Sequence, residues 1–206
     1  MSKAYFEFVF GAMGCGKTSE LRGNYYSKVG ELFEVVIVKP SKDKKGEEYI
    51  VARDGSKLKV DFLLNDSDNI YDLISSYLFD NNLDYILVDE IQFLNEEQII
   101  QLSRIVDKLG INVVGYGIIT DFCGHMFEGA IHVMEWADKF SYLDSQCSCG
   151  NLKIRNMRLY NGEAVFEGEQ VAIDGVDFNY KSVCRECYLK EKNKVKKKII
   201  YKNKSK

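Results

Sequence analysis

One stretch decides the fold of this chain: GAMGCGKT, residues 11–18. It satisfies the spacing G-x-x-x-x-G-K-[ST] and follows residues 5–10, whose aromatic and β-branched side chains predict a strand. Glycines let the backbone curl until several N–H groups point at one anion, and a helix that begins there adds the positive end of its dipole. Lys17 can reach the β- and γ-phosphates of a nucleoside triphosphate, and the Thr18 hydroxyl can ligate Mg²⁺.

The pattern outward from this loop predicts an α/β core. Short apolar runs at 35–38, 85–88 and 111–114 are typical of strands that are covered on both faces, as in a parallel sheet. Helical spacing lies between them, at 18–34 and at 95–109. In the second helix Asn95 can cap the start with Gln98 three residues on, and Gly110 ends it. Residues 40–60 interrupt this rhythm with charges and glycines, and we expect an exposed loop or hairpin there.

Composition excludes several classes of protein. The chain has 206 residues, 46% of them hydrophobic and 29% charged, which is globular composition with a single proline, Pro40. No stretch approaches the roughly 20 apolar residues of a membrane span, and the start of the chain is too short and too polar for a signal peptide. We therefore expect a cytoplasmic protein with no membrane partner.

Charge divides the chain unevenly. The net charge is −3, but residues 190–206 contain nine lysines and one acid, which leaves 19 basic and 30 acidic residues in the rest of the chain. An acidic body is a poor match for a nucleic-acid backbone, so nucleic acid is an unlikely partner, and the tail is expected to be disordered. A composition shift near Asp144 divides the chain into residues 1–144, a nucleotide-binding domain, residues 145–189, a smaller domain, and residues 190–206, the tail.

A phosphate-binding loop needs an acid at the end of a neighbouring strand, and Asp89 follows the apolar run 85–88. Asp89 would hold Mg²⁺ directly or through water. Glu90 points differently and is free to take the proton from an attacking hydroxyl or water. Many ATPases also carry Asp-Glu here, so the pattern alone leaves the role of Glu90 open.

Two cysteine pairs predict a metal site: Cys147-Ser148-Cys149 and Cys184-Arg185-Glu186-Cys187. The second pair has the spacing of a zinc knuckle, whereas the first is tighter than usual. Four thiolates form a closed, structural zinc site rather than a catalytic one, and unligated thiols are the alternative. Near the end of the expected strand at 113–119, Phe122 and Phe127 lie among glycines, where they could stack on a base or simply fill the core.

These segments together resemble the cellular-type, or type II, thymidine kinases. The likeness rests on six motifs in one order: residues 11–21, 89–93 (DEIQF), 115–122 (GYGIITDF), 127–129 (FEG), 167–171 (EGEQV) and 180–187 (YKSVCREC). The C-x-C-G form of the first cysteine pair is more similar to the bacterial branch. The resemblance runs from about residue 5 to residue 188.

The resemblance implies a RecA-like P-loop parallel sheet with a small zinc-binding domain whose loop, the lasso, closes over the nucleoside. It also implies transfer of the ATP γ-phosphoryl group to the 5′-hydroxyl of thymidine, and deoxyuridine is a further possible substrate. Enzymes of this family are usually homotetramers that dTTP inhibits.

The resemblance also assigns residues to roles. Glu90 and Lys17 are the catalytic residues. The remaining assignments form three sets: for ATP, Gly11, Ala12, Met13, Gly14, Cys15, Gly16, Lys17, Thr18, Asp89, Glu90, Ile91 and Gln92; for the nucleoside, Phe93, Ile118, Phe122, Phe127, Val171, Ile173 and Tyr180; for metals, Cys147, Cys149, Cys184 and Cys187 with zinc, and Thr18 and Asp89 with magnesium.

Three departures and two alternatives stay open. Gly14-Cys15 replaces the family's usual Phe-Ser, and Lys45 replaces an arginine whose phosphate contact Arg53 would have to take over. The stretch 173–180 is one residue longer than usual. The alternative functions are a RecA-like ATPase that acts on nucleic acid through the basic tail, and a binding module that holds zinc and nucleotide without turnover.

Overall fold

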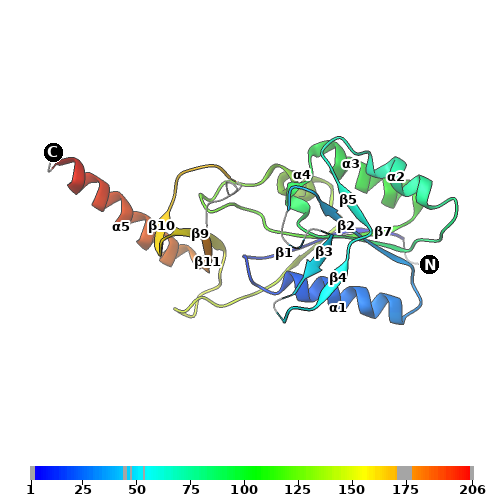
Figure 1. Cartoon of the computed structure of the whole chain (residues 1–206), viewed down its shortest axis with the longest axis horizontal. Coiled ribbons are helices and arrows are strands. Elements are labelled where there is room, and N and C mark those ends of the chain that lie inside the picture. The colour runs from blue at the N-terminus through cyan, green and yellow to red at the C-terminus, as the bar shows by residue number, and fades with distance from the viewer. Residues whose placement is uncertain (1–2, 44–45, 47, 53, 171–177, 205–206) are drawn as a thin grey trace. The chain divides into compact units, whose positions relative to one another are not determined.

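The structure is a computed structural model that describes residues 3–43, 46, 48–52, 54–170 and 178–204. The chain forms two compact units (Figure 1). The first comprises Met1–Phe10, Gly16–Ile119 and Phe127–Leu143, and the second comprises Gly11–Cys15, Thr120–Met126 and Asp144–Lys206. Their main border lies beside Asp144, although the second unit also takes two short segments from the body of the chain. The division into three functional domains stays a prediction.

The described part of the first unit contains a six-stranded parallel sheet in the order β5-β2-β6-β7-β1-β8. Its strands are β1 (Phe6–Phe10), β2 (Val35–Pro40), β5 (Phe62–Leu64), β6 (Tyr85–Val88), β7 (Asn112–Gly117) and β8 (Lys139–Tyr142). The apolar runs of the sequence thus become the inner strands, and the predicted α/β parallel sheet is confirmed. In such a sheet the carboxyl ends of the strands meet at one edge, which is where ligands bind.

Both faces of this sheet are buried. On one face Phe8, Val38 and Ile86 pack in a core with Ile99 and Val133 of the helices above it. The strand residues that alternate with them face the other side and form a second core: Val9, Ile37, Leu87, Val114 and Tyr116. Leu21, Ile50 and Leu58 pack onto this second core from outside the sheet. Figure 1 shows α2, α3 and α4 on one side of the sheet and α1 with the β3–β4 hairpin on the other. The inner strands β2, β6 and β7 are thus buried on both faces, whereas the edge strand β8 is largely exposed.

The helices of the first unit are α1 (Lys17–Gly30), α2 (Ile70–Tyr77), α3 (Glu96–Arg104) and α4 (Glu128–Trp136), with a 3₁₀ turn η1 (Ile91–Phe93) and a π-helical turn η2 (Ile105–Leu109). The predicted capping box is present: Asn95 accepts from the Gln98 N–H, and Gln98 reaches back to the Asn95 N–H. Gly110 ends η2 at φ 72°, so the predicted helix 95–109 is confirmed.

Helix α1 is shorter than the sequence predicted. It ends at Gly30, and Leu32 is 90% exposed in the left-handed region at φ 68°. Leu21, Tyr25, Val29 and Leu32 have helical spacing in the sequence, but of these four Leu21 alone is buried. The Phe33 N–H donates to the Lys28 carbonyl, which closes the helix one turn early. The expected loop or hairpin at 40–60 is a hairpin of β3 (Tyr49–Val51) and β4 (Lys57–Lys59).

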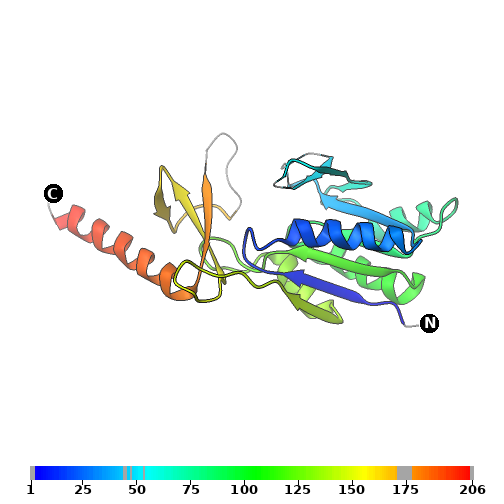
Figure 2. The ribbon, with the colours of Figure 1, turned by 90° about the horizontal axis from the view of Figure 1, so that it is seen from below.

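The second unit contains, in its described residues, a three-stranded antiparallel sheet of β9 (Arg155–Tyr160), β10 (Glu163–Val165) and β11 (Asn179–Val183). Asn161 and Gly162, both at positive φ, form the turn between β9 and β10, as an Asn-Gly pair commonly does in a hairpin. Helix α5 (Arg185–Lys204) follows β11, as Figure 2 shows, and continues through residues 190–204, where we expected disorder. Lysine is a good helix former, and the turn at Cys184–Cys187 supplies the nucleus. None of the described helices is long and apolar enough to cross a membrane.

Candidate active site

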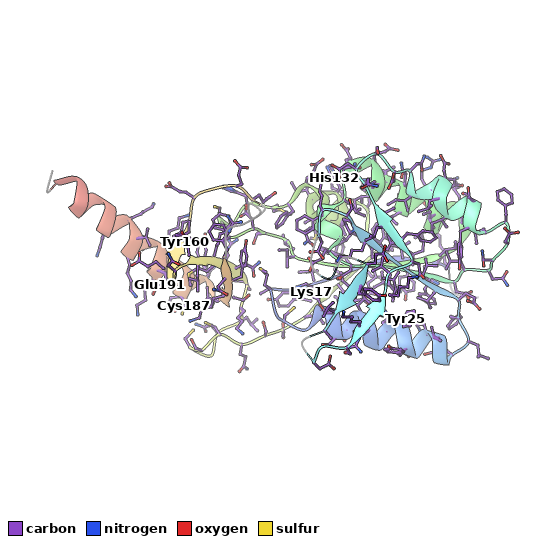
Figure 3. The ribbon with its side chains drawn as sticks, in the orientation of Figure 1. Lys17, Tyr25, His132, Tyr160, Cys187 and Glu191 are labelled. Carbon is purple, nitrogen blue, oxygen red and sulfur yellow. The ribbon has the colours of Figure 1, made fainter. Side chains whose placement is uncertain are left out.

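The glycine-rich loop curls as its sequence predicts. Gly14 and Gly16 have φ of 73° and 105°, values that only glycine adopts readily, and the Cys15 N–H donates to the Ala12 carbonyl at 3.2 Å. Lys17 opens α1 and is buried at 8% exposure (Figure 3). No side chain caps the start of α1, which is the arrangement expected where an anion takes the cap's place. Gly14, which replaces the phenylalanine that is usual in the family, therefore has a backbone conformation that suits a curled loop.

Residues 11–15, the first part of the glycine-rich loop, belong to the second unit, and hydrogen bonds connect them to its strands β9 and β11. Asn156 of β9 is 4% exposed, and its Oδ1 accepts from the Met13 N–H at 2.8 Å. Ser182 of β11 donates to the Met13 carbonyl at 2.6 Å, and Asn156 Nδ2 donates to the Thr120 carbonyl at 3.1 Å. These bonds fix the path of residues 11–15 from outside the loop. Sequence reasoning missed Asn156 and Ser182, because both are single polar residues with no motif around them.

Asp89 lies at the carboxyl end of β6, as predicted. Its N–H donates to the Val38 carbonyl at 2.9 Å, which extends the β2–β6 pairing by one residue. The side chain is 8% exposed. Burial, and next the charge of Glu90, raise the pKa of the Asp89 carboxyl from 3.8 to about 7. Such an acid is well placed for a cation, which would supply the charge that its surroundings lack.

Lys39 is a polar residue of this edge that sequence reasoning missed. It lies on β2 with a 1% exposed side chain, and its Nζ pairs with Asp43 at 3.0 Å. Its charge lowers the pKa of Asp89 and so acts against burial. The signal was available, since Lys39 is the one charged residue in the apolar run 35–40.

Glu90 leaves the strand in an unusual backbone conformation. Its φ of 49° and ψ of 42° are left-handed, which costs a non-glycine residue energy and is found mostly at functional positions. The half-buried carboxylate accepts from Gln92 Nε2 at 2.6 Å. Asp89 is thus buried at the carboxyl end of β6, whereas Glu90 is half-buried at a turn.

Three of the residues that the sequence assigns to the nucleoside gather near this turn. Phe93 and Phe127 meet edge to face, with ring centroids 5.5 Å apart and an interplanar angle of 84°. Ile118, which follows β7, is buried and donates its N–H to Gln92. The Ile91 side chain is fully buried, so a contact of Ile91 with ATP would have to come from its backbone.

In the second unit Arg158 of β9 organises the remaining aromatic residues. Its guanidinium carbon lies 3.7 Å from the centroid of Phe122, and its Nε donates to the Tyr180 hydroxyl at 2.9 Å. Its other nitrogens donate to the carbonyls of Glu169 and Gln170, at 2.9 and 3.1 Å. The side chain is 3% exposed, and an arginine so buried is fixed by its whole fork of donors. Sequence reasoning missed Arg158, which no motif marks.

The cysteine pairs come together in the second unit. One ligand atom from each of Cys147, Cys149, Cys184 and Cys187 lies within 4.8 Å of the others (Figure 3 labels Cys187). The Sγ atom of Cys149 is 3.5 Å from that of Cys184 and 3.6 Å from that of Cys187. A tetrahedral zinc ion with Zn–S bonds of 2.3 Å separates its sulfurs by about 3.8 Å, so the cluster fits such an ion.

Backbone N–H groups favour the thiolate form in this cluster. The Cys149 N–H lowers the pKa of the Cys147 thiol to about 6, and the Cys187 N–H, 3.4 Å from the Cys184 sulfur, lowers the pKa of Cys184. Metals bind thiolates rather than thiols. Hydrogen bonds with the neighbouring thiols, that of Cys149 first, act the other way on Cys187 and raise its pKa to about 12. A metal ion would therefore have to displace a proton at Cys187.

Two cavities lie apart from the predicted residues. One, of about 480 Å³, is in the first unit between α1 and the sheet, with Glu7, Glu20 and Tyr116 among its lining residues. The other, of about 430 Å³, is in the second unit beside Asp121 and Gln170. Val171 and Ile173, which were assigned to the nucleoside, and Lys45 and Arg53, which were considered for phosphate, lie outside the described residues.

Comparison with known proteins decides the family. The family model described as thymidine kinase matches residues 4–188. A thymidine kinase of Shewanella oneidensis is 38% identical over 181 residues, which are 87% of this chain and 93% of that protein. One of Haemophilus influenzae is 37% identical over 194 residues (93% and 98%), and one of Legionella pneumophila is 35% identical over 190 residues (91% and 90%).

The chain belongs to the thymidine kinase family. The resemblance drawn from six motifs is therefore confirmed, and with it the α/β P-loop fold class and an enzyme that is a nucleoside kinase acting on thymidine. The alternative, an ATPase that acts on nucleic acid, is not favoured. The roles of single residues in this thymidine kinase are not decided by kinship and are proposed below.

The raised pKa of Asp89 gives the thymidine kinase a testable pH dependence. Because folding favours the protonated carboxyl, this contribution to stability is fully present below pH 4 and is lost as the pH rises through about 7. We expect Asp89→Asn, which cannot ionise, to be more stable than the parent at pH 8 in metal-free buffer, by up to about 4 kcal/mol. The difference in free energy of unfolding between Asp89→Asn and the parent should decrease toward zero as the pH falls to 4. Urea denaturation of both proteins from pH 4 to pH 8 measures it, and parallel stability curves would contradict the shift.

Proposed function

We propose that this chain transfers the γ-phosphoryl group of ATP to the 5′-hydroxyl of thymidine, with Glu90 as the general base. The observation that carries the proposal is the state of Glu90: its backbone is left-handed directly after the strand-end Asp89, and Gln92 Nε2 donates to its carboxylate at 2.6 Å. A base fixed in one orientation can take the proton as the hydroxyl oxygen attacks the phosphorus. Strain retained at such a turn is expected where the position serves chemistry.

The glycine-rich loop and Lys17 would bind the triphosphate of ATP. The curled backbone offers N–H groups to the triphosphate, and the Lys17 ammonium stabilises the charge that develops on the transferred group. Thr18 and Asp89 would hold Mg²⁺, which would neutralise part of the triphosphate charge. Little covalent chemistry is left to the protein, so most of the rate enhancement would come from positioning.

For the nucleoside we propose the residues that the family resemblance assigns to it: Phe93, Ile118, Phe122, Phe127 and Tyr180. An apolar wall that contains a few fixed polar groups is what a pyrimidine site requires. Val171 and Ile173 stay assigned to the base by the family resemblance.

Four wider assignments rest on that resemblance or on general chemistry. Deoxyuridine would be accepted beside thymidine, dTTP would inhibit the enzyme, and the active form would be a homotetramer. We also propose a cytoplasmic location, because free cysteines persist in reducing compartments. The acidic body of the chain supports no role for nucleic acid.

Replacing the proposed base tests the function directly. We expect Glu90→Gln to lower kcat by about 10²- to 10⁴-fold, which is the usual contribution of a general base. The assay should use labelled ATP and a panel of nucleosides and identify the 5′-phosphate formed. Glu96→Gln removes an exposed acid on α3 and should leave kcat unchanged. Near-full turnover in a folded Glu90→Gln protein would refute the assignment.

Arg158 gives a second test, on the nucleoside side. Arg158→Met removes the donors to Tyr180 and to two carbonyls, and charged hydrogen bonds of this kind contribute about 1.5–3 kcal/mol each. The KM for thymidine should rise by at least about tenfold while the KM for ATP changes little. Arg155→Met, on the same strand, removes one charge without these contacts and is the matched control. An equal rise in both KM values would speak against a role in base binding.

We propose that the cysteine cluster holds one structural zinc ion per chain. The sulfur separations, together with thiol pKa values lowered by backbone N–H groups, support this choice. Cys184→Ser should lose the metal and lower the melting temperature, whereas Cys123→Ser, outside the cluster, should keep both. Elemental analysis after dialysis and a melt with a strong chelator measure the effect. A parent protein that contains no zinc after expression with zinc would contradict the proposal.

A further inference from the structure

The side chain of Gln92 is engaged at both ends. It is 2% exposed, although it lies in a motif that the resemblance assigns to ATP. Its Nε2 donates to Glu90 Oε2 at 2.6 Å, and its Oε1 accepts from the Ile118 N–H at 3.1 Å. Ile118 directly follows β7, so the amide connects the Glu90 carboxylate to the end of a central strand.

Two glycines leave room for this amide and for its turn. A Cβ atom on Gly117 would lie 2.5 Å from Gln92 Oε1, which is closer than real Cβ atoms approach. A Cβ atom on Gly129, at the start of α4, would lie 2.4 Å from the Leu94 carbonyl oxygen and 2.8 Å from that of Gln92. Turn η1 is therefore in close contact with β7 on one side and with α4 on the other. The glycines of the motifs GYG and FEG thus have a packing role at the Glu90 turn.

Together these contacts leave Glu90 little freedom. Its backbone is in the left-handed region, and the one described hydrogen bond to its carboxylate comes from a buried amide whose own oxygen is fixed by the sheet. A carboxylate that is oriented before substrate arrives loses no conformational freedom at the moment of reaction. A rotation of this carboxylate would break the amide bridge.

We propose that Gln92 is a positioning residue that orients the Glu90 carboxylate toward the nucleoside hydroxyl, and that Gly117 and Gly129 keep its amide in place. This inference rests on the proposed role of Glu90 as base. Gln92 touches neither substrate in this account. It acts through Glu90 alone, and that distinguishes it from a nucleotide-binding residue.

The chain contains a matched control. Gln101 of α3 is 5% exposed, its Oε1 accepts from the Ile70 N–H at 2.8 Å, and its Nε2 donates to Glu97 at 3.2 Å. The bonding is the same as at Gln92, with a buried amide between a backbone N–H and a glutamate. Gln101 lies on α3, outside the proposed machinery. Gln101→Met therefore reproduces the structural loss of Gln92→Met without the catalytic one.

The test is a double-mutant cycle on the full-length enzyme. Gln92→Met should lower kcat by about 10- to 100-fold with both KM values nearly unchanged, because a small misplacement of a catalytic group has an effect of this size. Gln101→Met should lower the melting temperature to a similar degree and keep kcat. In a Glu90→Gln background, Gln92→Met should cause no further loss, since its effect passes through the missing base. Gly117→Ala, which displaces the amide, should behave as Gln92→Met does.

Several results would overturn the inference. Full kcat in a folded Gln92→Met protein would do so, and so would an equal loss of kcat in the parent and the Glu90→Gln backgrounds, which would leave the base assignment intact. Full turnover in Glu90→Gln itself would overturn the proposed function together with this inference. If Gln92→Met does not fold, Gln92→Asn keeps an amide that is too short to span both partners, and the same fall in kcat is expected.

Discussion

The hydrogen bond from the Asp89 N–H to the Val38 carbonyl is the contact on which the candidate site depends. It carries the β2–β6 pairing one residue past the apolar strands, so that a carboxylate is buried at the edge of a sheet whose faces are closed. The chain then turns at once through a left-handed residue, and Glu90 leaves in another direction. One backbone bond thus gives two adjacent acids different surroundings, and we propose a different role for each: Asp89 toward Mg²⁺ and Glu90 toward the hydroxyl proton.

The same edge shows how a small number of glycines decides a site. Gly14 and Gly16 are needed for their positive φ, since the loop must curl around an anion. Gly117 and Gly129 are needed for the opposite reason, because they allow a neighbouring turn to come close. A glycine in a motif therefore does not by itself show which of these two roles it has. The backbone angle and the space around a Cβ atom placed there distinguish the two roles.

The sequence predicted what local pattern determines. Apolar runs gave the strands, Asn95 and Gln98 gave a helix start, and the cysteine pairs gave their cluster. It did not predict bonds between distant residues: Asn156 to Met13 spans 143 positions, and Ile118 to Gln92 spans 26. It also placed Leu32 in a helix, because helical spacing does not reveal a left-handed residue that closes the helix early. The residues that the sequence did not predict correctly are polar or strained, and their conformation depends on contacts with another segment of the chain.

The second unit explains why a metal and an arginine would both be needed there. Its core comprises Cys147, Met157, Val183, Cys184 and Tyr188, and two of these five buried residues are thiols. So little apolar surface supplies little stability, and small domains of this kind usually depend on a metal or a disulfide. Arg158 makes up part of the remainder, since one buried guanidinium joins an aromatic ring, a tyrosine hydroxyl and two carbonyls of the chain at 169–170.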